Sequence, residues 1–168
     1  IILTYELINE FGDSYVGFNY DGKSYIDVER SLLEVKSTAS HESIHQIAWY
    51  EMGSGVDNGK RVGINEALTE YFAQLIMGEE YPINHCSYEP SVLKIKTLVN
   101  EGIFTNEELM HAYFVDHDLS VLNSRFKNVS ANKFFELFDD AISDDPELKN
   151  KALDQIEKYI QELIKSRE

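Results

Sequence analysis

Ionisable side chains interrupt two segments that otherwise show the apolar pattern of buried helices, and this limits the folds open to the chain. In the first segment, HESIHQIAWY, His41 and His45 stand four residues apart. In the second, INEALTEYFAQLIM, Glu66 and Glu70 have the same spacing. Residues four apart share one face of a helix, and carboxylates beside an apolar face are costly to bury unless something neutralises them. We therefore expect the two helices to meet around a cation.

The rest of the 168-residue chain predicts an α+β fold in a single domain spanning residues 1–168. Asp21 and Gly22 separate two β-prone runs, 15–20 and 24–28, which predicts a hairpin and hence a small antiparallel sheet. Helical periodicity predicts a short first helix over Leu3–Phe11. It also predicts a mostly helical body after the hairpin, with helices near 38–52, 65–77, 90–101, 105–113, 131–142 and 146–166.

Several residues are expected to mark where these helices begin and end. Asn65 and Ser130 are plausible N-caps, and Pro146 opens the last helix. Gly53 and Gly78 are plausible C-terminal stops. Between them, the glycine-rich stretch GSGVDNGKRVG is expected to be a loop, and it lacks the glycine–lysine–hydroxyl order of a phosphate-binding loop.

The charge, cysteine content and hydropathy of the chain bear on its partners and location. The chain has 15 Lys and Arg against 30 Asp and Glu, a net charge of −15, which disfavours nucleic acid and anionic membrane as partners. Cys86 is the only cysteine, so no disulfide can form within the chain. No apolar run reaches the length of a membrane-spanning helix, and we expect no membrane insertion. Because the sequence starts at Ile1, we expect a fragment or processed part of a longer chain, with a secreted or cell-surface location preferred over the cytoplasm.

The spacing of the ionisable residues predicts a specific chemistry. Two imidazoles one helical turn apart can bind one zinc ion, and Glu42, about 100° further around the helix, lies beside the metal as a candidate general base. Catalytic zinc generally has three protein ligands, and Glu66 in the next helix can supply the third. Glu70, one turn later, can accept a hydrogen bond from the free nitrogen of a ligand imidazole.

The pair HESIH and NEALTE resembles the signature of the gluzincins, the zinc metallopeptidases that include thermolysin and the zinc aminopeptidases. The resemblance implies a zincin-like helical body and Zn²⁺ bound by His41, His45 and Glu66. It implies that Glu42 activates a zinc-bound water to hydrolyse a peptide bond, and that Glu70 supports a ligand histidine. It further suggests that the edge of the sheet containing the 24–28 strand pairs with an extended peptide or protein substrate.

The sequence also departs from the gluzincin pattern. The glycine-rich exopeptidase motif of the aminopeptidases is absent from the amino-terminal region, which favours an endopeptidase, and Ala67 stands where those enzymes often have glycine. The tyrosine or histidine that often contacts the oxyanion has no motif to mark it. His111, Tyr113 and His117 are the catalytic candidates for that role.

Two other functions remain open from the sequence. One is a regulatory metallopeptidase module that cleaves a repressor, because such modules also place residues like YFAQLIMG after a Glu-bearing helix. The other is a catalytically silent, zincin-like binding domain. Substrate preference and oligomeric state are not fixed by any feature of the sequence.

Overall fold

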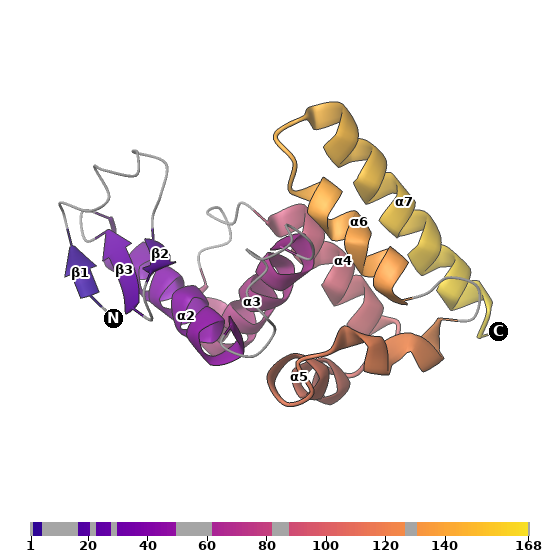
Figure 1. The fold of residues 1–168 in the computed structure, drawn as a ribbon, viewed down its shortest axis with the longest axis horizontal. Helices are drawn as coiled ribbons and strands as arrows, with labels where there is room; N and C mark the ends of the chain where they lie inside the picture. Colours follow the sequence, from indigo (N-terminus) through magenta and orange to yellow (C-terminus); the bar gives the residue numbers. More distant parts are fainter. Residues whose placement is uncertain are drawn as a thin grey trace. The chain divides into compact units, whose positions relative to one another are not determined.

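A computed structural model of the chain describes residues 2–4, 17–20, 23–27, 30–49, 62–81, 88–126 and 131–167. It confirms the α+β fold class, with a small sheet preceding a helical body (Figure 1). The elements, in chain order, are β1 (Ile2–Thr4), β2 (Gly17–Tyr20), β3 (Lys23–Asp27), α2 (Leu32–Trp49), α3 (Val62–Met77), η2 (Gly78–Glu80), α4 (Glu89–Asn100), α5 (Asn106–Phe114), η3 (Leu119–Arg125), α6 (Ala131–Ala141) and α7 (Pro146–Lys165).

The contacts group the chain into two compact units. The first comprises residues 1–50 and 69–87, and the second comprises residues 51–68 and 88–168. The dividing line falls within α3, between Leu68 and Thr69, so this continuous helix contributes one half to each unit. The assignment of the whole chain to a single domain stays a prediction.

The sheet of the first unit has three strands in the order β1-β3-β2. The predicted hairpin is confirmed, because β2 and β3 pair antiparallel with Tyr20 opposite Lys23. The predicted first helix is wrong at Leu3, which lies in β1 and pairs in parallel register with Ile26. This pairing joins segments far apart in sequence, so local periodicity could not reveal it. The turn at Asp21 and Gly22 and the rest of the predicted first helix lie outside the described residues.

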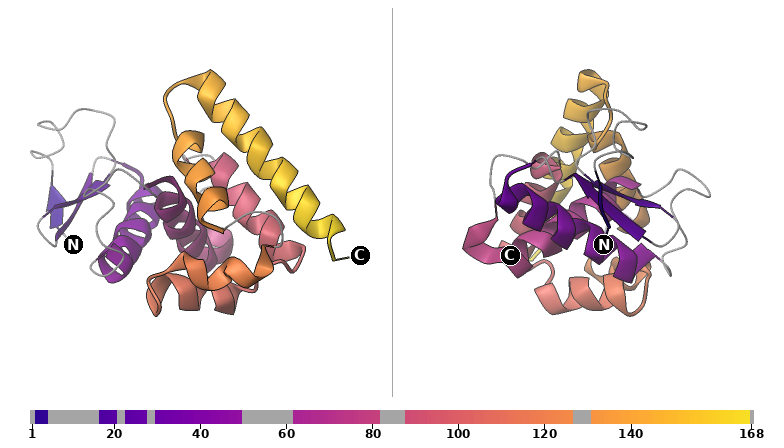
Figure 2. Two further views of the ribbon diagram at one scale, coloured as in Figure 1. Left: turned by 45° about the vertical axis from the view of Figure 1, so that its right-hand side comes forward. Right: turned by 90° about the vertical axis from the view of Figure 1, so that its left-hand side faces the viewer.

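Helix α2 covers the sheet through contacts with β2 and β3, as both views of Figure 2 show. On β3, Ser24 and Ile26 are buried, whereas the neighbouring residues are more exposed. This alternation is typical of a strand with one face against a helix. The Phe18 and Tyr25 rings stack across the hairpin with centroids 5.1 Å apart.

The second unit is built around α6 and α7, which lie side by side (Figure 2), and α4 packs against α7. Its core is aromatic: the Phe134 ring lies 5.4 Å from that of Phe135 and 5.7 Å from that of Phe138. All three side chains are fully buried, and α7 adds the buried Ile156 and Ile160. Burying side chains of this size supplies the main favourable term for folding.

Helix boundaries follow the sequence prediction for most helices. One exception is α2, which was predicted near 38–52 but already begins at Leu32. The other is Asn65, which was expected to be an N-cap. This residue lies inside α3, which begins at Val62. The backbone amide of Gly63 instead donates to Oδ1 of Asp139 on α6, at 2.7 Å. A side chain distant in sequence therefore accepts a hydrogen bond from one of the backbone amides that the first turn of a helix leaves without a partner inside the helix. Val62 and Gly63 are therefore helical rather than part of the predicted loop. Gly53 and Ser130 lie outside the described residues.

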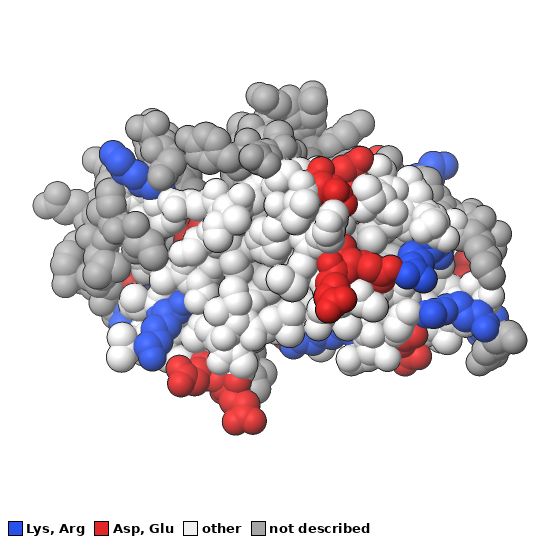
Figure 3. All heavy atoms as spheres, turned by 90° about the horizontal axis from the view of Figure 1, so that it is seen from below, with Lys and Arg blue, Asp and Glu red and all other residues white. Residues whose placement is uncertain are grey.

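No helix among the described residues is long and apolar enough to span a bilayer. On the face shown in Figure 3, the described Lys and Arg side chains are spread over the surface, some beside acidic groups. The expectation that nucleic acid is not a partner rests on the net charge of the sequence.

Candidate metal centre

His41, His45 and Glu66 form the one group of metal-ligand side chains found among the described residues. Helix α2 supplies both histidines from successive turns, and α3 supplies the glutamate. One ligand atom from each residue lies within 4.8 Å of the other two. The residues that sequence reasoning selected as ligands are therefore brought together.

The two histidines face each other with the same ring atom, Nε2. Nε2 of His41 lies 3.0 Å from Nε2 of His45, and the rings meet edge to face at 77°. In a tetrahedral site with metal–nitrogen bonds of about 2.0–2.1 Å, two ligand nitrogens lie about 3.3 Å apart. The observed separation is close to that value. Two imidazoles and one carboxylate are also a donor set that suits a divalent metal ion. The three residues therefore fit a zinc ion in both spacing and chemistry.

The far side of the His41 ring is held by Glu70, as the sequence predicted. Nδ1 of His41 lies 2.8 Å from Oε2 of Glu70, and Glu70 is buried. An ionised carboxylate only accepts hydrogen bonds, so the ring donates from Nδ1 and keeps its Nε2 lone pair for a ligand. Histidines that bind metals are usually oriented in this way.

The far side of the His45 ring is held by Thr69, a residue that sequence reasoning missed. Oγ1 of Thr69 lies 3.3 Å from Nδ1 of His45, and both side chains are buried. A hydroxyl can donate or accept, so Thr69 can serve either tautomer of the ring. A signal was present in the sequence, because Thr69 is three residues after Glu66 and hence on the same side of the helix.

The first turn of α3, which carries Glu66, is fixed by contacts within the second unit. A Cβ added at Gly63 would lie only 1.9 Å from the carbonyl oxygen of Phe138, so α3 and α6 touch backbone to backbone. Next to Glu66, the Asn65 side-chain oxygen accepts a 2.5 Å hydrogen bond from the hydroxyl of Tyr113. These contacts set the position of the turn that carries the third candidate ligand.

Glu42 lies on α2 between the two histidines, and its side chain is buried. The first residue of β2 packs against this turn. A Cβ added at Gly17 would lie 2.5 Å from Cγ2 of Thr38 and 3.4 Å from Cγ of Glu42. The start of β2 therefore lies beside the turn of α2 that carries the candidate general base, and the Thr38 methyl group leaves little room for a side chain at position 17.

The three downstream candidates have different surroundings. Tyr113 is fully buried and bonded to Asn65, beside the candidate ligand Glu66. His111 is exposed, and its Nδ1 lies 2.8 Å from Oδ2 of Asp116. His117 has a φ of 50°, in the left-handed region that few residues other than glycine adopt. The oxyanion role stays a prediction for each of the three.

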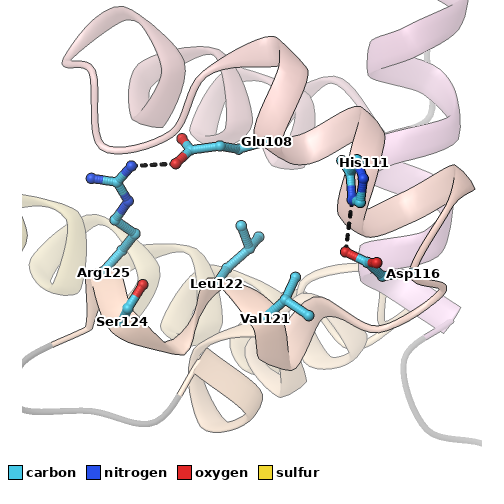
Figure 4. Close-up of a pocket in the computed structure, with 7 residues that line it drawn as sticks. All are labelled: Glu108, His111, Asp116, Val121, Leu122, Ser124 and Arg125. Carbon is cyan, nitrogen blue, oxygen red and sulfur yellow. Dashed lines mark hydrogen bonds and ion pairs between the residues drawn. The ribbon is translucent and has the colours of Figure 1, made fainter.

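His111 instead lines a surface pocket of about 180 Å³ between α5 and η3. Figure 4 shows its pair with Asp116 on one side and the Arg125–Glu108 ion pair on the other. The guanidinium of Arg125 is the largest influence holding the pKa of Glu108 below its ordinary value. The charged side chains that line the pocket are thus paired with one another. Glu108 also forms a capping box with Thr105 at the start of α5. We therefore interpret the pocket as part of the junction between α5 and η3.

Comparison of the sequence with protein-family models and with curated proteins, and of the structure with solved structures, gives no match.

Proposed function

We propose that this chain is a zinc-dependent peptide hydrolase, acting as an endopeptidase. The observation that carries the proposal is the convergence of His41 and His45 on α2 with Glu66 on α3, with ligand atoms all within 4.8 Å of one another. Helix α2 also carries Glu42. Two nitrogen donors and one oxygen donor favour Zn²⁺, and three protein ligands leave a position for water or substrate, as catalytic sites require.

A zinc ion held by these residues would lower the pKa of a bound water molecule to about 7 and would polarise a carbonyl group. Glu42 would accept a proton at its carboxylate from the water that attacks the peptide carbonyl. It would then deliver this proton to the nitrogen of the leaving amine, so the carboxylate would be regenerated at the end of each turnover. Its burial beside the two histidines supports this role.

The sheet supplies a place for the substrate backbone. The gluzincin resemblance suggests that an edge of the sheet containing the 24–28 strand pairs with the substrate, and the strand formed there, β3, is the central one. Strand β2 is the edge strand beside α2 and pairs with β3 alone among the described strands. We infer that an extended peptide adds to β2 by main-chain hydrogen bonds. The packing of Gly17 against Glu42 supports this arrangement, because it brings the start of the edge strand to the turn of α2 that carries the general base.

The proposal is tested by digesting a peptide library with the zinc-loaded protein, with and without a chelator. Cleavage at internal peptide bonds that stops on chelation and returns on adding Zn²⁺ is the expected result. A protein that binds zinc yet cleaves no peptide would contradict the enzymatic assignment and would leave a silent metal-binding domain.

A further inference from the structure

The carboxylate of Glu70 has more than one partner. One oxygen, Oε2, lies against Nδ1 of His41 at 2.8 Å. The other, Oε1, accepts a hydrogen bond from the hydroxyl of Tyr81 and a longer one, at 3.3 Å, from Nε2 of Gln74. Glu70 is only 4% exposed, so water contributes little to holding the carboxylate. Its orientation is set by these protein groups.

Tyr81 reaches Glu70 because the chain reverses direction after α3. If the helix continued, Tyr81 would lie about 16 Å further along its axis than Glu70, beyond the reach of a tyrosine side chain. Instead α3 ends at Met77, Gly78 takes a φ of 57°, and the short helix η2 follows. The backbone amide of Tyr81 donates to the carbonyl of Gly78 at 3.2 Å, which closes the turn. The reversal brings the tyrosine back to the helix face that carries Glu70.

The direction of each hydrogen bond follows from the chemistry of the groups. An ionised carboxylate offers only acceptors, so Tyr81 and Gln74 must donate to Oε1. With that oxygen fixed, the plane of the carboxylate is fixed, and Oε2 accepts from the N–H at Nδ1 of His41. The Nε2 lone pair of His41 is then left pointing towards Nε2 of His45, 3.0 Å away. The hydroxyl of Tyr81 thus acts on the imidazole through one intervening residue.

We propose that Tyr81 is a positioning residue of the metal centre, which holds Glu70 and through it keeps the His41 imidazole in the orientation and tautomer needed to bind the metal. This inference rests on the proposed function for the identity of the metal. It goes beyond the ligand set, because it assigns a role to a residue outside both sequence motifs.

The test replaces Tyr81 by phenylalanine, which removes the hydroxyl and keeps the ring. Residues that hydrogen-bond directly to a metal ligand typically contribute 10- to 100-fold to metal affinity. Tyr81 is one hydrogen bond further from the ligand, so we expect its hydroxyl to contribute about 3- to 10-fold. Zinc affinity of Tyr81→Phe, measured by competition with a chromophoric chelator, should fall by that factor. Tyr159→Phe is the matched control, because it removes a tyrosine hydroxyl from α7 that contacts Gln155. Its zinc affinity should equal that of the parent.

A double-mutant cycle shows whether Tyr81 acts through Glu70. In a Glu70→Ala background the hydroxyl has no carboxylate to hold, so adding Tyr81→Phe should change zinc affinity by less than about 2-fold. Equal losses from Tyr81→Phe in the parent and in the Glu70→Ala background would overturn the proposal. Circular dichroism of each variant establishes that the helices are intact.

Nitrogen-15 NMR of the imidazoles in metal-free protein, at one fixed pH, separates this inference from the proposed function. Tyr81→Phe should shift the His41 ring signals away from the pattern of a ring protonated at Nδ1, and Tyr159→Phe should not. Unchanged His41 signals in Tyr81→Phe would overturn the positioning role. A parent protein that binds no zinc would instead refute the proposed function, while the imidazole signals would still decide the role of Tyr81.

Discussion

His41 and His45 face each other with their Nε2 atoms 3.0 Å apart, and the Nδ1 atom of each ring contacts a side chain of α3. The two supporting residues, Glu70 and Thr69, are consecutive in the sequence. One face of a single helix therefore supplies both supports as well as the third candidate ligand, Glu66. A helix that shifted or rotated would disturb all three at once, which is why the contacts that fix α3 matter for the metal centre.

Replacing Glu42 by glutamine separates metal binding from catalysis. The amide keeps the shape of the side chain but cannot accept the proton, and general base catalysis typically contributes about 10²- to 10⁴-fold. We expect Glu42→Gln to bind zinc as tightly as the parent and to lose turnover by a factor in that range, measured with a fluorogenic peptide. Turnover equal to that of the parent would show that another group accepts the proton.

Replacing Thr69 by valine removes the hydroxyl beside Nδ1 of His45 with little change of volume. Loss of a group that orients a ligand imidazole is expected to weaken zinc binding about 10-fold, measured by chelator competition. Thr97→Val is the control, because its hydroxyl contacts the backbone carbonyl of Leu93 on α4. Zinc binding equally tight in Thr69→Val and Thr97→Val would mean that Thr69 does not support the ligand.

Replacing Gly63 by alanine tests the close contact between α3 and α6. Helix propensity alone would make alanine more favourable by about 1 kcal/mol. The added Cβ, however, would lie 1.9 Å from the Phe138 carbonyl oxygen and 2.2 Å from its carbon, so the helices must separate. We expect the free energy of unfolding, measured in urea, to fall by about 1–3 kcal/mol.

The exposed residue Glu107 offers a control for this substitution, because it occupies the second position of α5 just as Gly63 does in α3. Glu107→Ala should change the free energy of unfolding by less than about 1 kcal/mol. A Gly63→Ala protein more stable than the parent would contradict the observed packing of α3 on α6.

The ion pair between Lys94 and Glu157 predicts a pH-dependent contribution to stability. The two groups lie 2.7 Å apart and join α4 to α7. The hydrogen bond from Lys94, followed by that from Gln161, holds the pKa of Glu157 below its ordinary value. A carboxyl with a lowered pKa in the folded state stabilises the protein above its unfolded pKa of about 4.3, and that stability is lost as the pH falls through the folded pKa.

Glu157→Gln should therefore lower the free energy of unfolding at pH 7, by about 0.5 kcal/mol because the pair is partly exposed. The difference from the parent should disappear at a pH well below about 4. Glu162→Gln, on the exposed side of the same helix, is the control. A difference that stayed constant from pH 7 to pH 3 would rule out ionisation of Glu157 as its cause.

Features that depend on neighbouring residues were predictable from the sequence. The last helix was expected over 146–166 and is found at Pro146–Lys165, because proline and apolar periodicity are local signals. The ligand spacing was predictable for the same reason, since His41 and His45 need only one helical turn to share a face.

Features that depend on distant partners were not predictable. Asn65 was expected to cap α3, but Asp139, 76 residues from Gly63 in the chain, accepts the amide hydrogen bond in the first turn. Leu3 has helical spacing to its neighbours, yet it pairs with β3. The contact of Tyr81 with Glu70 depends on the chain reversal at Gly78, which no motif encodes. In each case tertiary contact decided the outcome rather than local preference.

The central claim is that His41, His45 and Glu66 hold one metal ion, and a calorimetric titration of metal-free protein with Zn²⁺ tests it most directly. The parent is expected to bind one zinc ion per chain. His45→Ala and Glu66→Ala, each lacking one ligand, are expected to bind more than about 100-fold more weakly, beyond the loss caused by removing a supporting residue. A parent that binds no zinc, or variants that bind it as tightly as the parent, would contradict the claim.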